Sequence, residues 1–574
     1  MGDCMFAVSY GPTLPISEET HASKYRSRGE TFYDAMCRIA AALADNEDHR
    51  REIKRILLQM AFLPGGRIQR AIGAPHKVTA FNCFVSGEIP DDSAGIMERA
   101  KEALLTMRMG GGIGYDFSTL RPRGDLIRSL SSPSSGPISF MGIFDAVCRT
   151  VSSAGNRRGA QMGVLRIDHP DIEEFIAAKQ NTSHLTYFNI SAAVTDEFMR
   201  AALEGKPFTL RFGGRDYATI DAAALWDKLM RSNWDWAEPG VLFIDRINEW
   251  NNLYYCETIS ATNPCGEQPL PPYGACLLGS LNLTKYIIFR GGRFVFDFEA
   301  FRADIAPIIR AMDNVIDQTI YPLPQQEQEA KHKRRMGIGV TGVANALEVM
   351  GYPYASEGYI DVQSAILETL RDEAYRASAM LAKEKGPFPA FRRDEYLAGK
   401  FIQTLPGDIR DLIAAHGIRN SHLLSIAPTG TISLSADNIS SGIEPVFAYE
   451  YHRTIIGEEG PEVERVTDWA YREHGVKGRT AEELEPEDHV RVLVAAQKYI
   501  DSAVSKTCNV GPDVSWERFK KIYEMAWQGG AKGCTTFRSA GKRAGILVKE
   551  DAPKAEEGGV CRIDPVTGIK SCDA

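Results

Sequence analysis

Long apolar segments are missing from this chain of 574 residues. No apolar run reaches the roughly 18 residues that cross a bilayer, and the N-terminus lacks the charged-then-apolar pattern of a secretion signal. No run of Lys and Arg exceeds three residues, and the net charge is −9. These features argue against a nucleic-acid polymer or an anionic membrane as the main partner, although small phosphorylated ligands remain possible. We therefore expect a cytoplasmic protein.

Nucleotide-binding signatures and repeats are also missing. No G-x-x-x-x-G-K-[ST] motif occurs, and "GGGIG" (110–114) is a poor match to G-x-G-x-x-G. We find no internal repeat. Eleven cysteines are present, but a cytoplasmic chain does not use them as a structural disulfide framework. A disulfide here would more often be catalytic or redox-active.

Composition divides the chain into three predicted parts. Residues 1–75 form a helical segment, because "TFYDAMCRIAAALAD" and "HRREIKRILLQMAF" place apolar residues at helical spacing. Residues 76–545 alternate short apolar runs, such as "MGVLRI" and "HLLSIAP", with amphipathic helical segments. This alternation favours an α/β fold with much parallel strand. Residues 546–574 are charged and poor in apolar side chains, which is typical of a flexible tail.

The stretch "TNPCGEQPLPPYGAC" (262–276) sets a thiol, Cys265, between Asn263 and Glu267. Its proline and glycine neighbours indicate a turn that can present the thiol at its tip. An isolated cysteine is more often a small buried hydrophobe. Nucleophilic cysteine catalysis usually needs a histidine, and none lies within fifty residues on either side. A thiol beside a carboxylate, without an imidazole, suits hydrogen-atom chemistry better than acyl transfer.

Ten motifs in order make the chain similar to ribonucleotide reductases over roughly residues 60–545. They are "MGGGIGYDFSTLRPRG" (109–124), "SSGPISFM" (134–141), "AGNRRGAQMGVL" (154–165), "HPDIEEFIAAK" (169–179), "NPCGEQPL" (263–270), "GSLNL" (279–283), "RMGIGVTG" (335–342), "APTGTIS" (427–433), "SSGIEP" (440–445) and "KGCTTFR" (532–538). An upstream "NCF" contains Cys83. Each motif alone is weak, but their shared order is specific.

The resemblance implies catalytic roles. Cys265 would carry the thiyl radical that abstracts the ribose 3′-hydrogen. Glu267 would take the 3′-hydroxyl proton, and Asn263 would hydrogen-bond the substrate hydroxyls. Cys83 and Cys276 would reduce the sugar and end as a disulfide, which requires Cα atoms about 4.4–6.8 Å apart.

The tail contains a second cysteine pair, Cys561 and Cys572, eleven residues apart. A zinc site would need closer pairs and two further ligands. A swinging dithiol that re-reduces Cys83–Cys276 by thiol–disulfide exchange fits better. We predict structural roles for the remaining cysteines and no metal-ligating residues.

Nucleotide-binding residues follow from the same resemblance. Alone, "SIAPTGTIS" fits an ordinary turn as well as a phosphate cradle; the resemblance makes it the substrate phosphate site. The predicted substrate-binding residues are Asn82, Gly112, Pro428, Thr429, Gly430, Thr431 and Ser433. A basic segment (152–161) and the segment 178–186 correspond to effector loops, although a solvated loop also explains the first. The predicted effector-binding residues are Asp145, Arg157, Arg158 and Lys179.

The radical source is inferred from what the chain lacks. "GCTTFR" contains no tyrosine pair for radical transfer from a second subunit, and no C-terminal glycyl-radical motif occurs. Ribonucleotide reductases differ in how they generate the thiyl radical, and the type that remains uses adenosylcobalamin. The segment "KGCTTFR" and the short spacing between Cys265 and Cys276 resemble that type. No D-x-H-x-x-G segment is present, which fits a cofactor that keeps its own base. Because the N-terminal segment is short, we expect no ATP cone, which is the N-terminal regulatory region of many relatives.

The resemblance also implies a fold, a reaction and partners. The fold would be a ten-stranded α/β barrel of two five-stranded parallel halves, with the Cys265 turn inside as a finger loop. The chain would reduce ribonucleoside di- or triphosphates for DNA synthesis, respond to a nucleoside triphosphate effector, use a thioredoxin- or glutaredoxin-type reductant, and form a homodimer. Two alternatives remain open: a subunit that needs a separate radical-generating protein, and an inert nucleotide-binding regulator.

Overall fold

The computed structural model describes residues 10–127, 131–151, 160–180, 183–457, 460–481, 483–538, 541–542, 562–563 and 570–571. Four residues named above lie outside these ranges: Arg157, Arg158, Cys561 and Cys572. So does Cys4, one of the remaining cysteines for which we predicted structural roles. Among the described residues, no helix combines the length and apolarity of a membrane span.

The larger sheet has eight strands in the order β13-β2-β3-β6-β7-β10-β21-β20. These are β13 (Ala275–Cys276), β2 (Cys83–Val85), β3 (Gly112–Asp116), β6 (Gln161–Arg166), β7 (Phe188–Val194), β10 (Gly240–Phe243), β21 (Gly533–Arg538) and β20 (Thr507–Val510). The five strands from β2 to β10 are parallel. β13 runs antiparallel to β2, and β21 antiparallel to β10. The predicted α/β fold with much parallel strand is confirmed.

A smaller sheet has the order β1-β14-β17. β1 (Phe62–Pro64) runs antiparallel to β14 (Leu278–Asn282), which is parallel to β17 (Gly337–Thr341). Isolated parallel bridges, Ile338–Leu424 and Ile426–Val504, continue it beyond β17. "HLLSIAP", which we counted among the apolar runs, therefore contributes bridges rather than a regular strand. The Leu423 and Leu424 N–H groups donate to the Asp501 carboxylate (2.7 and 2.9 Å), so the ladder is interrupted. The two sheets share no strand, and a closed barrel is not confirmed.

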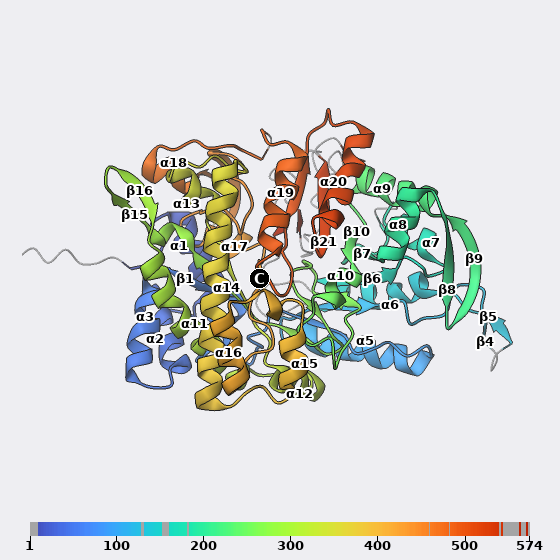
Figure 1. The fold of residues 1–574 in the computed structure, drawn as a ribbon, viewed down its shortest axis with the longest axis horizontal. Coiled ribbons are helices and arrows are strands. Elements are labelled where there is room, and N and C mark those ends of the chain that lie inside the picture. The colour runs from blue at the N-terminus through green and yellow to red at the C-terminus, as the bar shows by residue number, and fades with distance from the viewer. Residues whose placement is uncertain are drawn as a thin grey trace, which may run out of the picture.

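Helices cover both sheets (Figure 1). α19 (Pro486–Gln497) and α20 (Trp516–Gln528) lie against β20 and β21, together with α9 (Ala222–Trp236). On the other side of the molecule, α11 (Phe298–Gln318) packs against the long α14 (Glu357–Lys385). The other helices are α4 (Gly66–Ala71), α5 (Ser93–Arg108), α6 (Pro137–Thr150), α7 (Ile172–Ala177), α8 (Asp196–Glu204), α10 (Ile244–Glu249), α12 (Pro324–Lys333), α13 (Val343–Val349), α15 (Arg393–Ala398), α16 (Gly407–His416), α17 (Gly430–Leu434) and α18 (Trp469–His474).

Two-stranded hairpins and short 3₁₀ helices complete the fold. The hairpins are β4–β5 (Leu126–Ile127, Ser132–Pro133), β8–β9 (Pro207–Phe212, Arg215–Asp221), β11–β12 (Ala261–Thr262, Pro269–Leu270), β15–β16 (Ile287–Arg290, Arg293–Phe296), β18–β19 (Glu450–Gly457, Gly460–Thr467) and β22–β23 (Arg562–Ile563, Lys570–Ser571). The 3₁₀ helices are η1 (Leu283–Tyr286) and η2 (Ile402–Thr404).

The N-terminal segment contains the helices that periodicity predicts: α2 (Phe32–Leu43) and α3 (Glu47–Leu58), preceded by α1 (Pro15–Tyr25). A capping box of Thr31 and Asp34 begins α2, which satisfies amides that have no acceptor within the helix. α2 and α3 pack on α11, so their apolar faces join the main core.

Candidate active site

The Cys265 turn is the tip of the β11–β12 hairpin, and we call residues 263–268 the finger loop. Asn263 and Gln268 close its base: the Asn263 N–H donates to the Gln268 carbonyl (3.1 Å), and the Gln268 N–H donates to Asn263 Oδ1 (2.9 Å). Gly266 has φ +84°, which favours glycine. Cys265 is 5% exposed and Glu267 2%. A short turn thus holds the amide, thiol and carboxylate together inside the protein.

Glycines on β3 let the finger loop approach the sheet. A Cβ at Gly114 would lie 1.8 Å from the Thr262 carbonyl oxygen, so no other residue fits there. A Cβ at Gly112 would lie 3.1 Å from both Cys83 Sγ and Pro264 Cγ. The predicted substrate-site residue Gly112 therefore lies where the finger loop meets Cys83.

Cys83 and Cys276 are register partners across the antiparallel β2–β13 pair. Opposite residues in such a pair have Cα atoms about 4.5–5.5 Å apart, within the range that a disulfide requires. Both are buried and in the thiol form. Burial, followed by the nearby Glu267 carboxylate and Cys83, raises the pKa of Cys276 well above its usual value. The structure thus brings the predicted reducing pair together, beside Glu267.

Cys265 is disulfide-bonded in this structure. The other described cysteines are thiols: Cys37, Cys83, Cys148, Cys256, Cys276, Cys508 and Cys534. A thiyl radical can form only from a thiol. The structure therefore represents an oxidised form of the site, and Cys265 must be reduced before it can take part in radical chemistry.

Several buried amide groups around the finger loop lack partners within the described part of the chain. Both amide atoms of Asn82, both of Gln268, and Nδ2 of Asn263 make no hydrogen bond. An unsatisfied buried polar group costs about 1–3 kcal/mol, so native proteins rarely keep several together. A ligand with several hydroxyl groups, such as a ribose, would satisfy them. Sequence reasoning missed Gln268, although it belongs to the quoted "NPCGEQPL" motif.

The predicted phosphate loop lies at the start of α17. Thr429 has φ +52°, and its hydroxyl lies 2.9 Å from that of Thr341 and 3.0 Å from that of Ser433. The Gly442 N–H also donates to the Thr429 hydroxyl (2.7 Å). These contacts shape the loop, while the first amides of α17 have no acceptor within the helix. Thr341 was missed, although "RMGIGVTG" contains it.

Comparison with known proteins gives the family. Residues 81–537 match the model of the ribonucleotide reductase barrel domain. The chain belongs to the ribonucleotide reductase family. It is 35% identical to the vitamin B12-dependent ribonucleoside-diphosphate reductase of Mycobacterium tuberculosis (strain CDC 1551 / Oshkosh), over 92% of this chain and 78% of that protein.

Two further relatives have similar names. The vitamin B12-dependent ribonucleoside-diphosphate reductase of Thermoplasma acidophilum is 35% identical, over 81% of this chain and 62% of the relative. The vitamin B12-dependent ribonucleotide reductase of Streptomyces clavuligerus is 28% identical, over 93% of this chain and 64% of the relative.

The predicted effector residues of this ribonucleotide reductase chain are only partly described. Asp145, on α6, accepts a hydrogen bond from the Tyr187 N–H (2.9 Å). Lys179 forms an ion pair with Glu238 (2.7 Å). The structure thus connects α6 with the segment before β7, whereas Arg157 and Arg158 fall outside the described residues.

The described part of the tail lies close to the site. The backbone of β23 packs beside α17, the helix that follows Thr429. Cys561 and Cys572 themselves lie outside the described residues.

A small cavity lies beside Cys265, between the finger loop and strands of the larger sheet. Its lining residues are Met162, Ser191, Val241, Leu242, Cys265, Gly266, Val504, Ser505, Lys506, Gly533, Cys534 and Thr535. A Cβ at Gly240, behind this wall, would lie 2.9 Å from Ser191 Oγ. Glycines at 240 and 533 therefore keep side chains out of the space beside Cys265.

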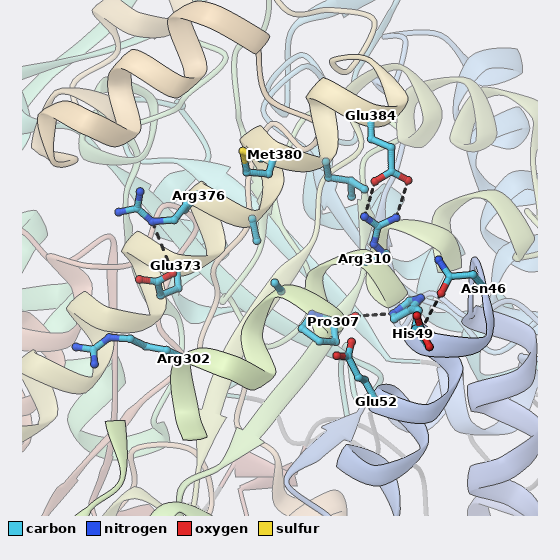
Figure 2. A pocket seen from close by; sticks show the side chains of 14 residues that line it. Asn46, His49, Glu52, Arg302, Pro307, Arg310, Glu373, Arg376, Met380 and Glu384 are labelled. Atoms are coloured by element: carbon cyan, nitrogen blue, oxygen red, sulfur yellow. Dashed lines mark hydrogen bonds and ion pairs between the residues drawn. The ribbon is translucent and has the colours of Figure 1, made fainter. Parts of the chain in front are cut away.

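A larger surface pocket, drawn in Figure 2, shares no lining residue with the cavity beside Cys265. It lies among α3, α11 and α14, and its charged groups are largely paired. Arg310 bonds to Glu384 (2.8 and 2.5 Å), and His49 Nε2 lies 3.0 Å from the Pro307 carbonyl. It contains no cysteine. The pocket therefore offers no chemistry for nucleotide reduction.

Proposed function

We propose that this chain reduces ribonucleotides to 2′-deoxyribonucleotides, with adenosylcobalamin as the radical source. One observation carries the proposal: the finger loop presents Asn263, Cys265 and Glu267 next to the opposed thiols of Cys83 and Cys276. A protein that only binds nucleotides needs none of these groups. The printed names of the relatives support the dependence on vitamin B12.

The proposed reaction assigns a step to each side chain. The Cys265 thiyl radical removes the 3′-hydrogen of the ribose, while Glu267 takes the 3′-hydroxyl proton and Asn263 holds the hydroxyls. The 2′-hydroxyl leaves as water, and Cys83 and Cys276 supply two electrons and their hydrogens as they become a disulfide. Cys265 then returns the hydrogen to C3′. The sum is one ribonucleotide and two thiols converted to one deoxyribonucleotide, one disulfide and water.

We place the adenosyl end of the cofactor at the cavity beside Cys265, which is small in this structure and would widen to admit it. Ser191 and Thr535 provide hydroxyl groups there, and Gly240 and Gly533 keep side chains out of the adjoining space. When bound, adenosylcobalamin supplies the radical that oxidises the Cys265 thiol. In this proposal the chain's own residues hold the adenosyl group beside Cys265 and exclude water.

We also propose that the two sheets close into the ten-stranded barrel. β14 begins two residues after β13 ends, and β20 begins three residues after Val504, whose bridge to Ile426 continues the smaller sheet. The chain therefore passes directly between the smaller sheet and each edge of the larger sheet. The finger loop would then lie in the barrel interior.

The remaining parts of the proposal concern partners. Cys561 and Cys572 would pass electrons from a thioredoxin- or glutaredoxin-type reductant to the Cys83–Cys276 disulfide. The position of β23 beside α17 supports access of the tail to the site. A nucleoside triphosphate would bind near Asp145 as effector, and the enzyme would act as a homodimer.

An activity assay tests the proposal. Purified, reduced chain is mixed with CDP or CTP and a dithiol, with adenosylcobalamin present or omitted. We expect deoxyribonucleotide only when the cofactor is present. Activity that ignores cobalamin and needs a second, metal-containing protein would favour the two-subunit alternative. Nucleotide binding without turnover would favour the inert regulator.

A further inference from the structure

The tip of the finger loop is held by side chains from outside it. Asn189 Nδ2 donates to the Pro264 carbonyl (3.1 Å). The Ser505 hydroxyl donates to the Cys265 carbonyl (3.2 Å), and the Ser425 hydroxyl to the Glu267 carbonyl (2.9 Å). Buried carbonyl groups need a donor, and these three receive one from Asn189, Ser505 and Ser425, which we call the loop anchors.

The loop anchors come from three separate strands or bridged segments. Asn189 lies on β7 of the larger sheet. The Ser425 N–H donates to the Ile338 carbonyl (3.1 Å), and the Ser505 N–H to the Ile426 carbonyl (2.8 Å). All three anchors are buried, at 7%, 1% and 7% exposure for Asn189, Ser425 and Ser505. The tip is thus tied to the backbone framework of both sheets.

Internal bonds alone leave the tip less constrained. The bonds between Asn263 and Gln268 fix the base of the loop, and the Gly266 N–H donates to the Asn263 carbonyl (3.1 Å). None of these bonds uses the Cys265 carbonyl. Hydrogen-atom transfer requires the reacting atoms to be nearly in contact, and a displacement of about 1 Å can cost about 10²-fold in rate.

We propose that Asn189, Ser425 and Ser505 are positioning residues that set where Cys265 and Glu267 lie against the ribose. This inference rests on the proposed function. The anchors do not touch substrate in the proposal; they act through the carbonyl groups of residues 264, 265 and 267. Ser505 has the most direct effect, because its partner is the carbonyl of Cys265 itself.

The test compares Ser505→Ala with Ser505→Thr. Alanine removes the hydroxyl, whereas threonine keeps it. For Ser505→Ala we expect kcat to fall about 10- to 100-fold, with KM for the nucleotide within about twofold, because the anchors act on reacting groups rather than on binding. Ser505→Thr should recover most of the loss. Asn189→Asp, which replaces the amide donor with a carboxylate, should repeat the effect of alanine.

Ser378→Ala is the matched control. The Ser378 hydroxyl is fully buried and donates to Asn420 Oδ1 (2.9 Å), away from the finger loop. Hydrogen–deuterium exchange of a peptide covering residues 261–270 gives a second readout, measured on reduced protein without cofactor. Exchange should accelerate at least about tenfold in Ser505→Ala, because the amides open more often, and should not change in Ser378→Ala.

The outcomes separate the two proposals. Unchanged kcat and exchange in Ser505→Ala, or equal losses in Ser505→Ala and Ser378→Ala, would overturn the positioning role. A wild-type chain that never reduces a nucleotide would refute the proposed function instead. The exchange measurement would then still show whether Ser505 orders the loop.

Discussion

Two pairs of cysteine thiols in this chain are both buried, but they differ in strand register and in their surroundings. Cys83 and Cys276 lie directly opposite each other across β2 and β13. Cys508 and Cys534 have sulfur atoms 4.0 Å apart, but the register partner of Cys508 is Thr536, two residues beyond Cys534. Such diagonal neighbours have Cα atoms about 7–8 Å apart, beyond the reach of an unstrained disulfide.

The surroundings differ as well. Beside the first pair lie unpaired amide groups and the Glu267 carboxylate. Around the second pair, Tyr523 bonds to Thr536 (2.9 Å), Cys508 packs in the apolar core, and Cys534 lies between that core and the cavity beside Cys265. Thiol proximity alone therefore does not identify a redox site. Strand register and unsatisfied polar neighbours are what separate the two pairs.

The largest expected difference is in turnover. Cys276→Ser should lower deoxyribonucleotide formation more than about a thousandfold, even in the first turnover, because one electron donor is lost. Cys508→Ser, in the second pair, should keep activity near wild type. Single-turnover assays on prereduced protein measure both. Equal losses of activity in the two variants would show that the two cysteine pairs do not differ in function.

The next largest effect concerns the tail cysteines, Cys561 and Cys572, which should matter for re-reduction of Cys83 and Cys276 but not for the first turnover. In the double variant Cys561→Ser/Cys572→Ser, a prereduced enzyme should complete one turnover normally. Multiple turnover with thioredoxin should fall at least about tenfold, since a folded reductant cannot enter a buried site, while a small dithiol should retain part of it. Steady-state rates with each reductant check this. Normal turnover with thioredoxin, or failure in the first turnover, would contradict the shuttle.

A smaller effect concerns stability. Cys508→Ala leaves a small cavity in a helix-covered core and should cost about 1 kcal/mol, seen as a melting temperature lower by roughly 1–2 °C. The variant should keep its activity. Thermal unfolding of the reduced protein measures the shift, with wild type as the reference. A loss of activity larger than the loss of stability would give Cys508 a chemical role.

The smallest expected effect is on the pH dependence of Cys276 alkylation. The pKa of Cys276 is raised mainly by burial, so its thiolate fraction stays low and keeps rising above pH 9. Alkylation of Cys276 should therefore be slow and show no plateau up to about pH 10.5, whereas a free thiol, half ionised near pH 8.5, reaches its plateau about one to two pH units higher. Above about pH 8.5 the unfolded chain loses thiol protons that the folded chain keeps, so this group lowers stability as pH rises. A plateau by about pH 10 would contradict the buried environment.

Local sequence predicted much of the molecule. Helical periodicity found α2 and α3, because one apolar face per helix is enough to define them. The finger loop was readable because Asn263 and Glu267 lie within two residues of Cys265. The Thr429–Ser433 loop was predicted as a phosphate site only from the family resemblance, because by itself it fits an ordinary turn equally well. Where the interacting residues are close in sequence, their spacing alone indicates that they lie together in the fold.

Other features could not be read locally. Gln268 and Thr341 lie inside the recognised motifs, but only their burial and contacts show their importance. The loop anchors lie outside the finger-loop motif, on segments far away in sequence. "HLLSIAP" looks like a strand by composition but pairs only through isolated bridges.

The sequence by itself determined the α/β class, the family and the chemical groups of the site, because residue type and short spacing carry that information. Only the tertiary structure decided which thiols face each other and what holds the finger loop in place. Cys83 and Cys276 meet through strand register, and the loop anchors meet the carbonyls of residues 264, 265 and 267 through packing of both sheets. The physical reason is that pairing between distant segments depends on the register and burial of the whole fold, which no local pattern specifies.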